Sequence, residues 1–401
     1  DLRRTETREA WNRFADSFNR PCTTRTRGSR KHGDNSSGKL FAQGCQLRPF
    51  LIGNVLEGFL LYIVEKAGET VTATKALGIV KPTKETLSEL LKKNKNFTAL
   101  AETLGTGYNT EEASDRLALV FTNISQLGLT YLVYPGAYHT RFHHALGAMH
   151  LTQRAIEILR AKNHEITENE SIATQIAILL HDIGHGPFSH ALENTVVKGV
   201  HHEELSVLFM KKLNEEFDGK LDLAISIFEK KYEKKFLHDL ISSQLDMDRL
   251  DYLRRDSFYT GVTEGAINSE RLLTMLNVHN DHLVIDGKGI YSVEKFIVAR
   301  RLMYWQVYLH KTVLSAEFML VKLLQRARFL ALSGSEIFSS SALNRFLYNS
   351  YNLYDFKSDD ELLHLFSQLD DYDILGAIKE WCNHKDDTQR SMSNNLINRK
   401  L

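Results

Sequence analysis

The sequence has few cysteines, few prolines, no excess of either charge and no long hydrophobic run. Its three cysteines lie far apart among 401 residues, which argues against a disulfide framework and favours a reducing compartment. Basic and acidic residues number 50 each, so bulk charge does not indicate a nucleic-acid or membrane-surface binding protein. The longest apolar run, near residues 59–64, is far too short to cross a bilayer. We therefore expect a soluble cytoplasmic protein without a membrane partner.

The last of the five prolines is Pro187, so no proline interrupts helices in the second half of the chain. Apolar residues recur there at helical spacing over residues 202–217, 221–231, 236–255, 269–278, 292–330 and 360–383. The stretch 282–291 instead alternates across a glycine-containing turn, which predicts a short β-hairpin. The expected fold class is mostly α, with one short hairpin.

Composition divides the chain into four parts. Residues 1–46 are rich in arginine and polar residues, which is typical of a disordered basic tail; an arm that binds single-stranded nucleic acid is the alternative. Residues 47–114 form a small helical region without a chemical motif. A continuous helical body follows over residues 115–330, and residues 331–401 form a C-terminal helical region.

Three histidines and one aspartate gather in the stretch His-Asp-Ile-Gly-His-Gly-Pro-Phe-Ser-His, residues 181–190. An apolar helix precedes it and starts at Thr167, where Glu170 completes a capping-box pattern. We expect this helix to carry His181 and Asp182 near its C-terminal end, about 100° apart around its axis. A metal ion between the two side chains could then contact both.

A metal ion held by imidazole and carboxylate groups needs further ligands from other helices. The candidates are His144, which ends an Arg-Phe-His-His run, and Asp248, in an Asp-Met-Asp-Arg-Leu-Asp-Tyr stretch. Mixed nitrogen and oxygen ligands suit Fe, Mn, Zn or Ni better than Mg²⁺ alone, although Mg²⁺ could accompany a nucleotide. For phosphate ester hydrolysis, His190 is the candidate general acid, and Glu193 could orient it.

Seven stretches between about Gln126 and His310 resemble the HD-domain phosphohydrolases. Within them, the chain is similar to the deoxynucleoside triphosphate triphosphohydrolases related to the vertebrate SAM- and HD-domain protein. The stretches are Gln-Leu-Gly (126–128), Tyr-Pro-Gly-Ala (134–137), His-Thr-Arg-Phe-His-His (139–144), His-Asp-Ile-Gly-His-Gly-Pro-Phe-Ser-His (181–190), His-Glu (202–203), Asp-Arg-Leu-Asp-Tyr-Leu-Arg-Arg-Asp (248–256) and Tyr-Leu-His-Lys (308–311). The resemblance implies the HD-domain helical fold, with additional N- and C-terminal helices. It also implies a metal ion bound by His144, His181, Asp182 and Asp248.

The resemblance also suggests how a triphosphate would be held. Four cationic side chains lie in or beside the matching stretches: Arg141, Arg249, Arg300 and Lys311. Arginine suits this task because it can make two parallel hydrogen bonds to a phosphate. His185 and His202 would face the substrate or support the metal ligands, with a purely structural role as the alternative. His201 could take the place of its neighbour His202 in the family pattern.

The sugar would be recognised by a second group of side chains. Tyr252 and Tyr308 could pack on the sugar, and Gln126 and Asp256 could form hydrogen bonds with its 3′-hydroxyl. In related enzymes, residues at matching positions have these roles. Leu127, together with Tyr308, would crowd a 2′-hydroxyl, so that ribonucleotides should be poor substrates.

Three functions fit these residues. The first is hydrolysis of deoxynucleoside triphosphates to a deoxynucleoside and inorganic triphosphate. The second is an HD-type nuclease or nucleotidase that acts on single-stranded nucleic acid or another phosphorylated nucleoside. The third is a binding module without turnover, against which the intact ligand set and His190 argue. The sugar-facing group favours the first function over the second. Related enzymes are oligomers, and the long apolar pattern at 292–330 could form an interface, so we expect a homo-oligomer.

Overall fold

The computed structural model describes residues 123–188, 192, 195 and 199–401. Its α-helices are α7 (Arg141–Ala161), α8 (Glu168–Leu179), α10 (His202–Glu216), α11 (Asp222–Phe228), α12 (Lys235–Ile241), α13 (Met247–Thr260), α14 (Ser269–Met275), α15 (Ile290–Met303), α16 (Lys311–Leu332), α17 (Ser341–Tyr348), α18 (Leu353–Ser358), α19 (Asp360–Ser367), α20 (Asp371–Trp381) and α21 (Asp387–Ile397). The remaining elements are η1 (Gly128–Leu132), η2 (Thr263–Gly265), η3 (Gly287–Gly289), η4 (Tyr304–Tyr308), and the strands β1 (Leu276–His279) and β2 (His282–Ile285). Over these residues the fold is mostly α with one two-stranded sheet, which confirms the expected fold class. The tail and small helical region expected at 1–114 lie outside this part of the chain.

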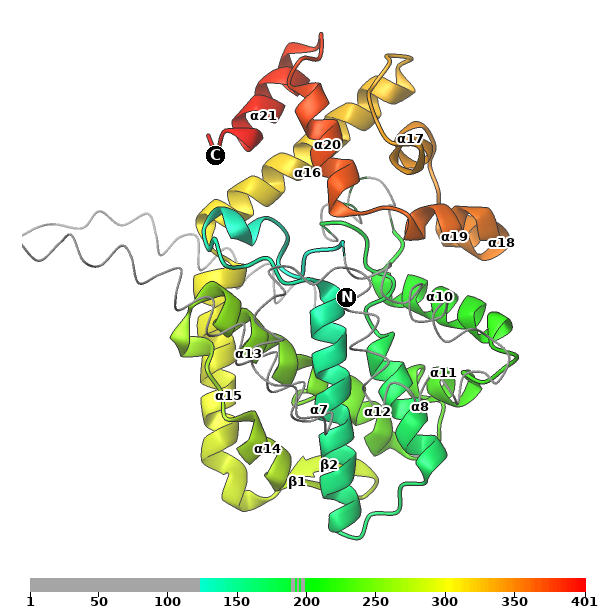
Figure 1. The fold of residues 1–401 in the computed structure, drawn as a ribbon, viewed down its shortest axis with the longest axis vertical. Helices are drawn as coiled ribbons and strands as arrows, with labels where there is room; N and C mark the ends of the chain where they lie inside the picture. The colour runs from blue at the N-terminus through cyan, green and yellow to red at the C-terminus, as the bar shows by residue number, and fades with distance from the viewer. Residues whose placement is uncertain (1–122, 189–191, 193–194, 196–198) are drawn as a thin grey trace, which may run out of the picture. The chain divides into compact units, whose positions relative to one another are not determined.

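Helix α7 runs through the middle of the helical body, between α8 on one side and α13 on the other (Figure 1). Its buried face is made of small and apolar residues such as Ala145, Ala148 and Leu151, which let the neighbouring helices approach closely. Helix α16 packs against α17 and α21, so the C-terminal helices extend the same body. Within the described ranges, no helix combines the length and apolar character that a membrane span requires.

The capping box predicted at Thr167 is present. The Thr167 hydroxyl accepts from the Glu170 backbone N–H at 3.2 Å, and the Glu170 carboxylate accepts from the Thr167 N–H at 2.7 Å. Helix α8 ends earlier than expected, at Leu179. His181 and Asp182 therefore lie in the turn that follows α8, and the expectation that they sit on the helix is wrong.

Three of the long helices expected from periodicity are each divided in two, and the one expected at 360–383 consists of α19 and α20. The pattern at 236–255 is broken between α12 and α13, where the Asp246 carboxylate accepts from the Arg249 backbone N–H at 2.7 Å and caps α13. The pattern at 292–330 is broken by a π-helical turn, η4, after which the His310 side chain caps α16. Apolar periodicity continues across both breaks, because each flanking helix still buries one face. The breaks place Asp248 in the first turn of α13 and Tyr308 at the end of η4.

The hairpin exists but begins six residues before the expected position. Strands β1 and β2 pair in antiparallel register, with His279 opposite His282. Asn280 and Asp281 form the turn with φ values of 51° and 62°, a conformation that these two residue types tolerate better than most. The glycines expected in the turn instead belong to η3, which leads into α15. The sequence therefore predicts a hairpin correctly, but its turn is formed by Asn280 and Asp281 and not by the glycines.

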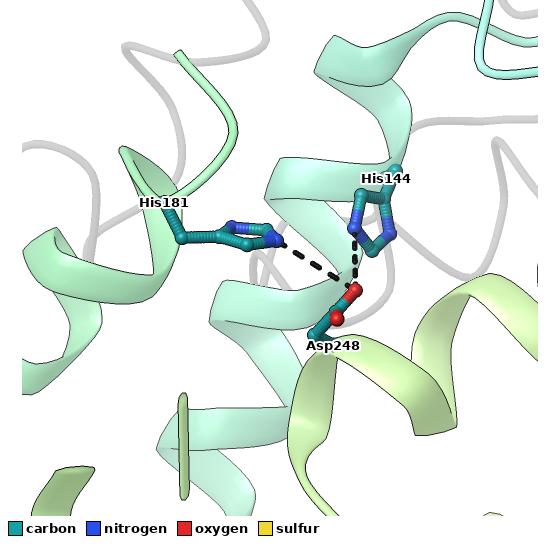
Figure 2. A group of neighbouring side chains, drawn as sticks. All are labelled: His144, His181 and Asp248. Carbon is teal, nitrogen blue, oxygen red and sulfur yellow. Dashed lines mark ion pairs between the residues drawn. The ribbon is translucent and has the colours of Figure 1, made fainter. Parts of the chain in front are cut away.

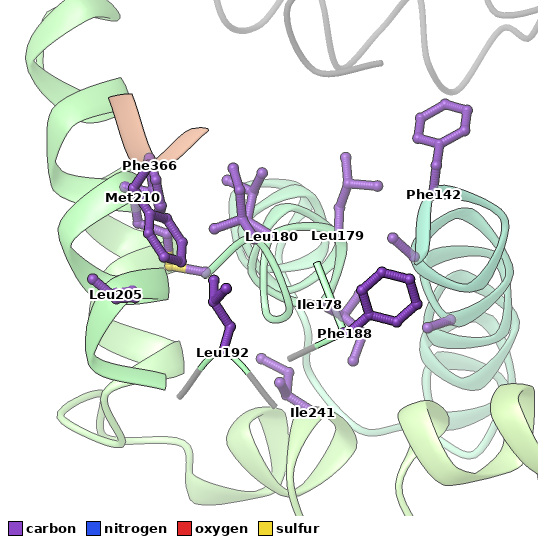
Figure 3. Close-up of a cluster of buried hydrophobic side chains, with 14 of the residues drawn as sticks. Phe142, Ile178, Leu179, Leu180, Phe188, Leu192, Leu205, Met210, Ile241 and Phe366 are labelled. Carbon is purple, nitrogen blue, oxygen red and sulfur yellow. The ribbon is translucent and has the colours of Figure 1, made fainter. Parts of the chain in front are cut away.

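A buried apolar cluster supports the turn that carries His181 and Asp182 (Figure 3). It includes Phe142 of α7, Ile178 of α8, Met210 of α10 and Phe366 of α19. The Phe366 ring lies so close to Gly186 that a Cβ there would come within 3.0 Å of it. The C-terminal helices therefore pack directly against the histidine-rich turn and fix its position.

Candidate metal centre

Side chains from three segments converge on one point (Figure 2). His144 comes from the first turn of α7, His181 from the turn after α8, and Asp248 from the first turn of α13. Asp248 Oδ1 lies 3.1 Å from His144 Nε2 and 3.6 Å from His181 Nε2. The facing atoms of the three residues all lie within 4.8 Å of one another. This spacing suits a single ion bound between them.

The hydrogen bonds of the two imidazoles leave the correct nitrogen for a metal. His144 Nδ1 bonds Asp251 at 2.9 Å, and His181 Nδ1 donates to the Ile178 carbonyl at 2.6 Å. Both Nε2 atoms are buried and have no hydrogen-bond partner with good geometry among the described residues, although Asp248 lies at ion-pair distance. A neutral imidazole that donates through Nδ1 offers the Nε2 lone pair to a metal. The residues present therefore fit a divalent ion.

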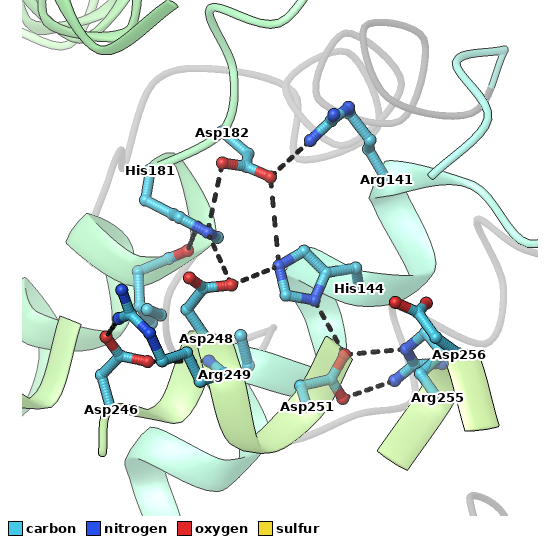
Figure 4. A network of polar contacts seen from close by, with 12 residues as sticks. Arg141, His144, His181, Asp182, Asp246, Asp248, Arg249, Asp251, Arg255 and Asp256 are labelled. Atoms are coloured by element: carbon cyan, nitrogen blue, oxygen red, sulfur yellow. Dashed lines mark hydrogen bonds and ion pairs between the residues drawn. The ribbon is translucent and has the colours of Figure 1, made fainter. Parts of the chain in front are cut away.

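Asp182 borders this cluster and faces it with both oxygens (Figure 4). Oδ1 lies 3.3 Å from His181 Nε2, while Oδ2 lies 4.0 Å from His144 Nε2 and 2.7 Å from Arg141 Nη1. All four residues expected as ligands are thus brought together. Arg141, expected to bind phosphate, is anchored beside them by Asp182.

The charges of the cluster depend on one another. Burial disfavours a charged imidazole, but the neighbouring carboxylates of Asp248 and Asp251 outweigh it and raise the pKa of His144 to about 10. Burial likewise opposes charge on Asp248, yet the two neighbouring imidazoles hold its pKa below its ordinary value. The acidic side chains thus favour positive charge at their centre. A divalent cation would satisfy the same carboxylates without a proton on either Nε2.

His185 and His202 stack beside the cluster. Their ring centroids are 3.9 Å apart, and His185 Nε2 lies 3.4 Å from Asp182 Oδ1. Burial and the charge of Arg141 lower the pKa of His185 to about 3, so the ring is neutral at pH 7. Gly184 allows α10 to approach, because a Cβ there would lie 2.1 Å from the His202 carbonyl oxygen. The prediction that His185 and His202 belong to the site environment therefore agrees with their positions.

A row of tyrosines leads away from the metal ligands. The Tyr252 ring lies 6.4 Å from that of His144 and 6.1 Å from that of Tyr308. The Tyr308 hydroxyl donates to Asp256 Oδ2 at 2.7 Å, while Asp256 Oδ1 bonds His139 at 2.7 Å. Three of the residues expected around a sugar, Tyr252, Tyr308 and Asp256, are therefore joined in one group next to the candidate metal ligands.

The cationic side chains expected to bind the triphosphate differ in their contacts. Arg249 is held by the buried carboxylate of Asp246, and Arg300 lies over the Tyr304 ring at 5.8 Å from its centroid. Both arginines lie close enough to Tyr252 to affect its hydroxyl. The pKa of Tyr252 is raised by burial, by Tyr304 and by Asp248, and the two arginines only partly offset this rise. Within the described part of the chain, no hydrogen bond or ion pair joins Lys311 to this group.

The remaining expected residues are Gln126, Leu127, His190 and Glu193. Gln126 has a buried Oε1 without a hydrogen-bond partner in the described residues, as expected of a group that binds a ligand. Leu127 packs partly buried against the core. His190 and Glu193 lie outside the described residues, so their roles stay predictions.

Two neighbours of His144 were not anticipated from the sequence. Asp251 bonds His144, and Arg255 donates to Asp251 from Nε at 2.8 Å and from Nη2 at 2.7 Å. Their four-residue spacing on α13 allows an ion pair, but nothing local in the sequence indicates that the pair is buried. His139, which bonds Asp256, was seen only as the start of a matching stretch.

Comparison with known proteins agrees with this geometry. The HD domain family matches residues 141–256, and the HD associated region matches residues 267–337. A phosphohydrolase from Bacteroides thetaiotaomicron, known from a crystal structure, is 54% identical in sequence to this chain. The match covers 74% of this chain and 73% of the Bacteroides chain, and the two structures superpose with a TM-score of 0.71. The chain belongs to the HD-domain phosphohydrolases.

Two curated relatives are more distant. The uncharacterized protein YwfO of Bacillus subtilis is 35% identical over 69% of this chain and 63% of its own length. The deoxynucleoside triphosphate triphosphohydrolase SAMHD1 homolog of Dictyostelium discoideum is 34% identical over 53% of this chain and 45% of its own length. The chain therefore spans only about half to two thirds of these curated relatives.

Proposed function

We propose that this protein hydrolyses deoxynucleoside triphosphates to a deoxynucleoside and inorganic triphosphate, using a divalent transition-metal ion. The observation that carries the proposal is the continuous row from the metal ligands through Tyr252 to the paired Tyr308 and Asp256. A metal-bound phosphate at one end would place a sugar near the other. The relative from Dictyostelium discoideum, a deoxynucleoside triphosphate triphosphohydrolase by name, supports this choice of substrate.

The metal would be bound by His144, His181, Asp182 and Asp248, and Fe, Mn, Zn or Ni suits this mixed set. When bound, such an ion polarises a phosphate oxygen and lowers the pKa of a water molecule. Arg141 is the cation nearest to the ligands and would neutralise charge on the phosphate. Mg²⁺ could accompany the nucleotide.

Charge along the triphosphate would be balanced by further cations. Arg249 and Arg300 act on Tyr252 from their two helices, so both lie close to the path between metal and sugar. Lys311 would have to reach the phosphates from the start of α16. Together with Arg141, these cations exceed what a terminal phosphate requires and favour a triphosphate held along its whole length.

Bond cleavage at the α-phosphorus requires a proton for the departing 5′ oxygen. His190 would donate it, and Glu193 would orient the imidazole, a contribution that is typically about 10² to 10⁴ in rate. The neutral His185 would remain a hydrogen-bonding partner of Asp182. Deoxynucleoside and intact triphosphate would then leave as products.

Sugar recognition would use the polar network around Asp256. Its carboxylate already accepts from Tyr308, and the buried Oε1 of Gln126 is the second polar atom that could meet a 3′-hydroxyl. The Tyr308 ring and Leu127 would leave no room for a 2′-hydroxyl. Ribonucleotides should therefore be poor substrates.

Chromatography of the reaction products tests the proposal. The purified protein is incubated with each of the four deoxynucleoside triphosphates, with ribonucleotides and with single-stranded DNA. Deoxynucleoside plus intact triphosphate is expected, and His190→Ala should lose most turnover while it keeps metal and substrate binding. A nucleoside di- or monophosphate as first product contradicts attack at the α-phosphorus, and cleavage of DNA alone favours the HD nuclease.

We further propose that the protein forms a homo-oligomer through α15 and η4. Ile290, Ile297 and Trp305 are 55%, 59% and 66% exposed, and their spacing of seven and eight residues brings them to the same side. Light scattering at micromolar concentration tests this assembly, and a monomer contradicts it. The cytoplasmic location and the contact of the basic tail with single-stranded nucleic acid stay predictions.

A further inference from the structure

The metal ligand His144 is held from behind by an acidic side chain of another helix. Its imidazole is completely buried, and its Nδ1–H donates to Asp251 Oδ2 at 2.9 Å, while Nε2 faces Asp248 (Figure 4). The ring therefore has a carboxylate at each nitrogen. One lies on the metal side and the other on the protein side.

Asp251 is itself fixed by two hydrogen bonds. Arg255, one turn further along α13, donates from Nε to Oδ2 at 2.8 Å and from Nη2 to Oδ1 at 2.7 Å. Both side chains are almost completely buried, at 8% and 11% exposure. A two-point contact with a guanidinium fixes the plane of the carboxylate, and so the direction from which it accepts the His144 proton.

A glycine of α7 makes room for this pair. A Cβ at Gly147 would lie 1.9 Å from Asp251 Oδ1 and 2.1 Å from Arg255 Nη2. Gly147 stands three residues after His144 on the same helix, so α7 carries both the metal ligand and the gap that admits its support. Glycine in a helix interior is ordinarily less favourable than alanine, so its presence here is accounted for by the close contact.

We propose that Asp251 is a positioning residue for the metal centre, and that Arg255 and Gly147 hold it in place. Asp251 fixes the tautomer and the orientation of His144, and its negative charge makes Nε2 a better electron-pair donor. The proposal rests on the metal centre of the proposed function and is independent of the substrate.

Metal affinity of purified protein tests this role. Asp251→Asn keeps the size of the side chain and an acceptor oxygen but removes the charge. We expect it to bind Mn²⁺ or Co²⁺ about 10- to 100-fold more weakly in competition with a chelator, the usual effect of losing such an outer partner. The visible absorption of the Co²⁺-loaded protein should also shift, because the donor strength of His144 changes.

A matched control separates positioning from general stability. Glu170 is an equally buried acid with its own cation, Lys234 at 2.8 Å, and lies on α8 away from Asp251. Glu170→Gln should lower the urea midpoint but leave metal affinity and the Co²⁺ spectrum unchanged. Should Asp251→Asn fail to fold, Arg255→Lys, which keeps the charge but loses the two-point contact, is expected to weaken Co²⁺ binding several-fold.

The possible outcomes distinguish the positioning role of Asp251 from the metal centre and from the substrate. A folded Asp251→Asn protein with wild-type metal affinity and an unchanged Co²⁺ spectrum overturns the positioning role alone. Wild-type protein that binds neither Mn²⁺ nor Co²⁺ overturns the metal centre and the positioning role together. A normal metal affinity without dNTP hydrolysis leaves the positioning role standing and rejects only the substrate.

Discussion

Replacing Gly147 with alanine should destabilise this protein, although the same change stabilises most helices. Gly147 lies within α7, where alanine would ordinarily gain about 1 kcal/mol. Its Cβ would, however, lie 1.9 Å from Asp251 Oδ1, and contacts below 3.0 Å are essentially never observed. Asp251 would have to retreat by about 1 Å, and its burial gives it no solvent into which to move.

The expected cost follows from two contributions. Overpacking of a buried site typically costs about 1–3 kcal/mol. A weakened hydrogen bond between charged groups, here Asp251 with Arg255 or His144, adds about 1.5–3 kcal/mol. After the helix gain is subtracted, Gly147→Ala should lower the free energy of unfolding by about 1.5–5 kcal/mol.

Urea unfolding followed by circular dichroism measures this difference, with a lower midpoint and an unchanged slope expected. Gly376 of α20 is the matched control, because a Cβ there would meet no atom within 4 Å. Gly376→Ala should raise stability by about 0.5–1 kcal/mol. If Gly147→Ala is as stable as the wild type or more so, the close contact between α7 and α13 does not exist as described.

Three further changes test other parts of the molecule. Asp182→Ala should remove the bound metal, and elemental analysis that finds full occupancy contradicts its role as a ligand. Burial would raise the pKa of Glu170, but its bonds with Lys234, Thr167 and Tyr232 together outweigh burial and lower the pKa to about 2. The ionised carboxylate therefore adds stability above the ordinary pKa of 4.5 that is lost as pH falls towards 2. The stability gap between wild type and Glu170→Gln should therefore narrow from pH 5 to pH 2.5 in urea titrations; a constant gap refutes this linkage. Tyr308→Phe removes the hydroxyl that Asp256 accepts but keeps the ring, so KM for deoxynucleotides should rise while discrimination against ribonucleotides persists; steady-state kinetics that show lost discrimination assign it elsewhere.

Helical periodicity predicted which segments are helical but not where they end. Each of these helix boundaries depends on one polar side chain that caps the helix. The periodicity of apolar residues does not show which side chain forms the cap. Asp246 caps α13 within a stretch that reads as one helix, and His310 does the same for α16. The hairpin position failed for a similar reason, because Asn280 and Asp281 adopt positive φ without any glycine.

The cluster of candidate metal ligands could be anticipated because His-Asp pairs and spaced acids are chemically distinctive. Their support could not, because Asp251 and Arg255 look like any exposed pair of charges four residues apart on a helix. Only the packing of α7 against α13 turns that pair inward, and a single glycine at 147 permits it. That closeness depends on tertiary structure and has no local pattern.

Helix α13 acts as one rigid element that carries several residues of the site. Asp248, Asp251, Tyr252 and Asp256 span eight residues, or about 12 Å along its axis. Any tilt or slide of this helix would move Asp248, the Tyr252 ring and Asp256, the acid proposed to contact the sugar, by related amounts. Geometry at the ion and geometry at the sugar therefore cannot be tuned separately by shifting the helix. Under the proposed function, changes in sugar preference should instead arise at η4, which carries Tyr308 but none of the candidate metal ligands.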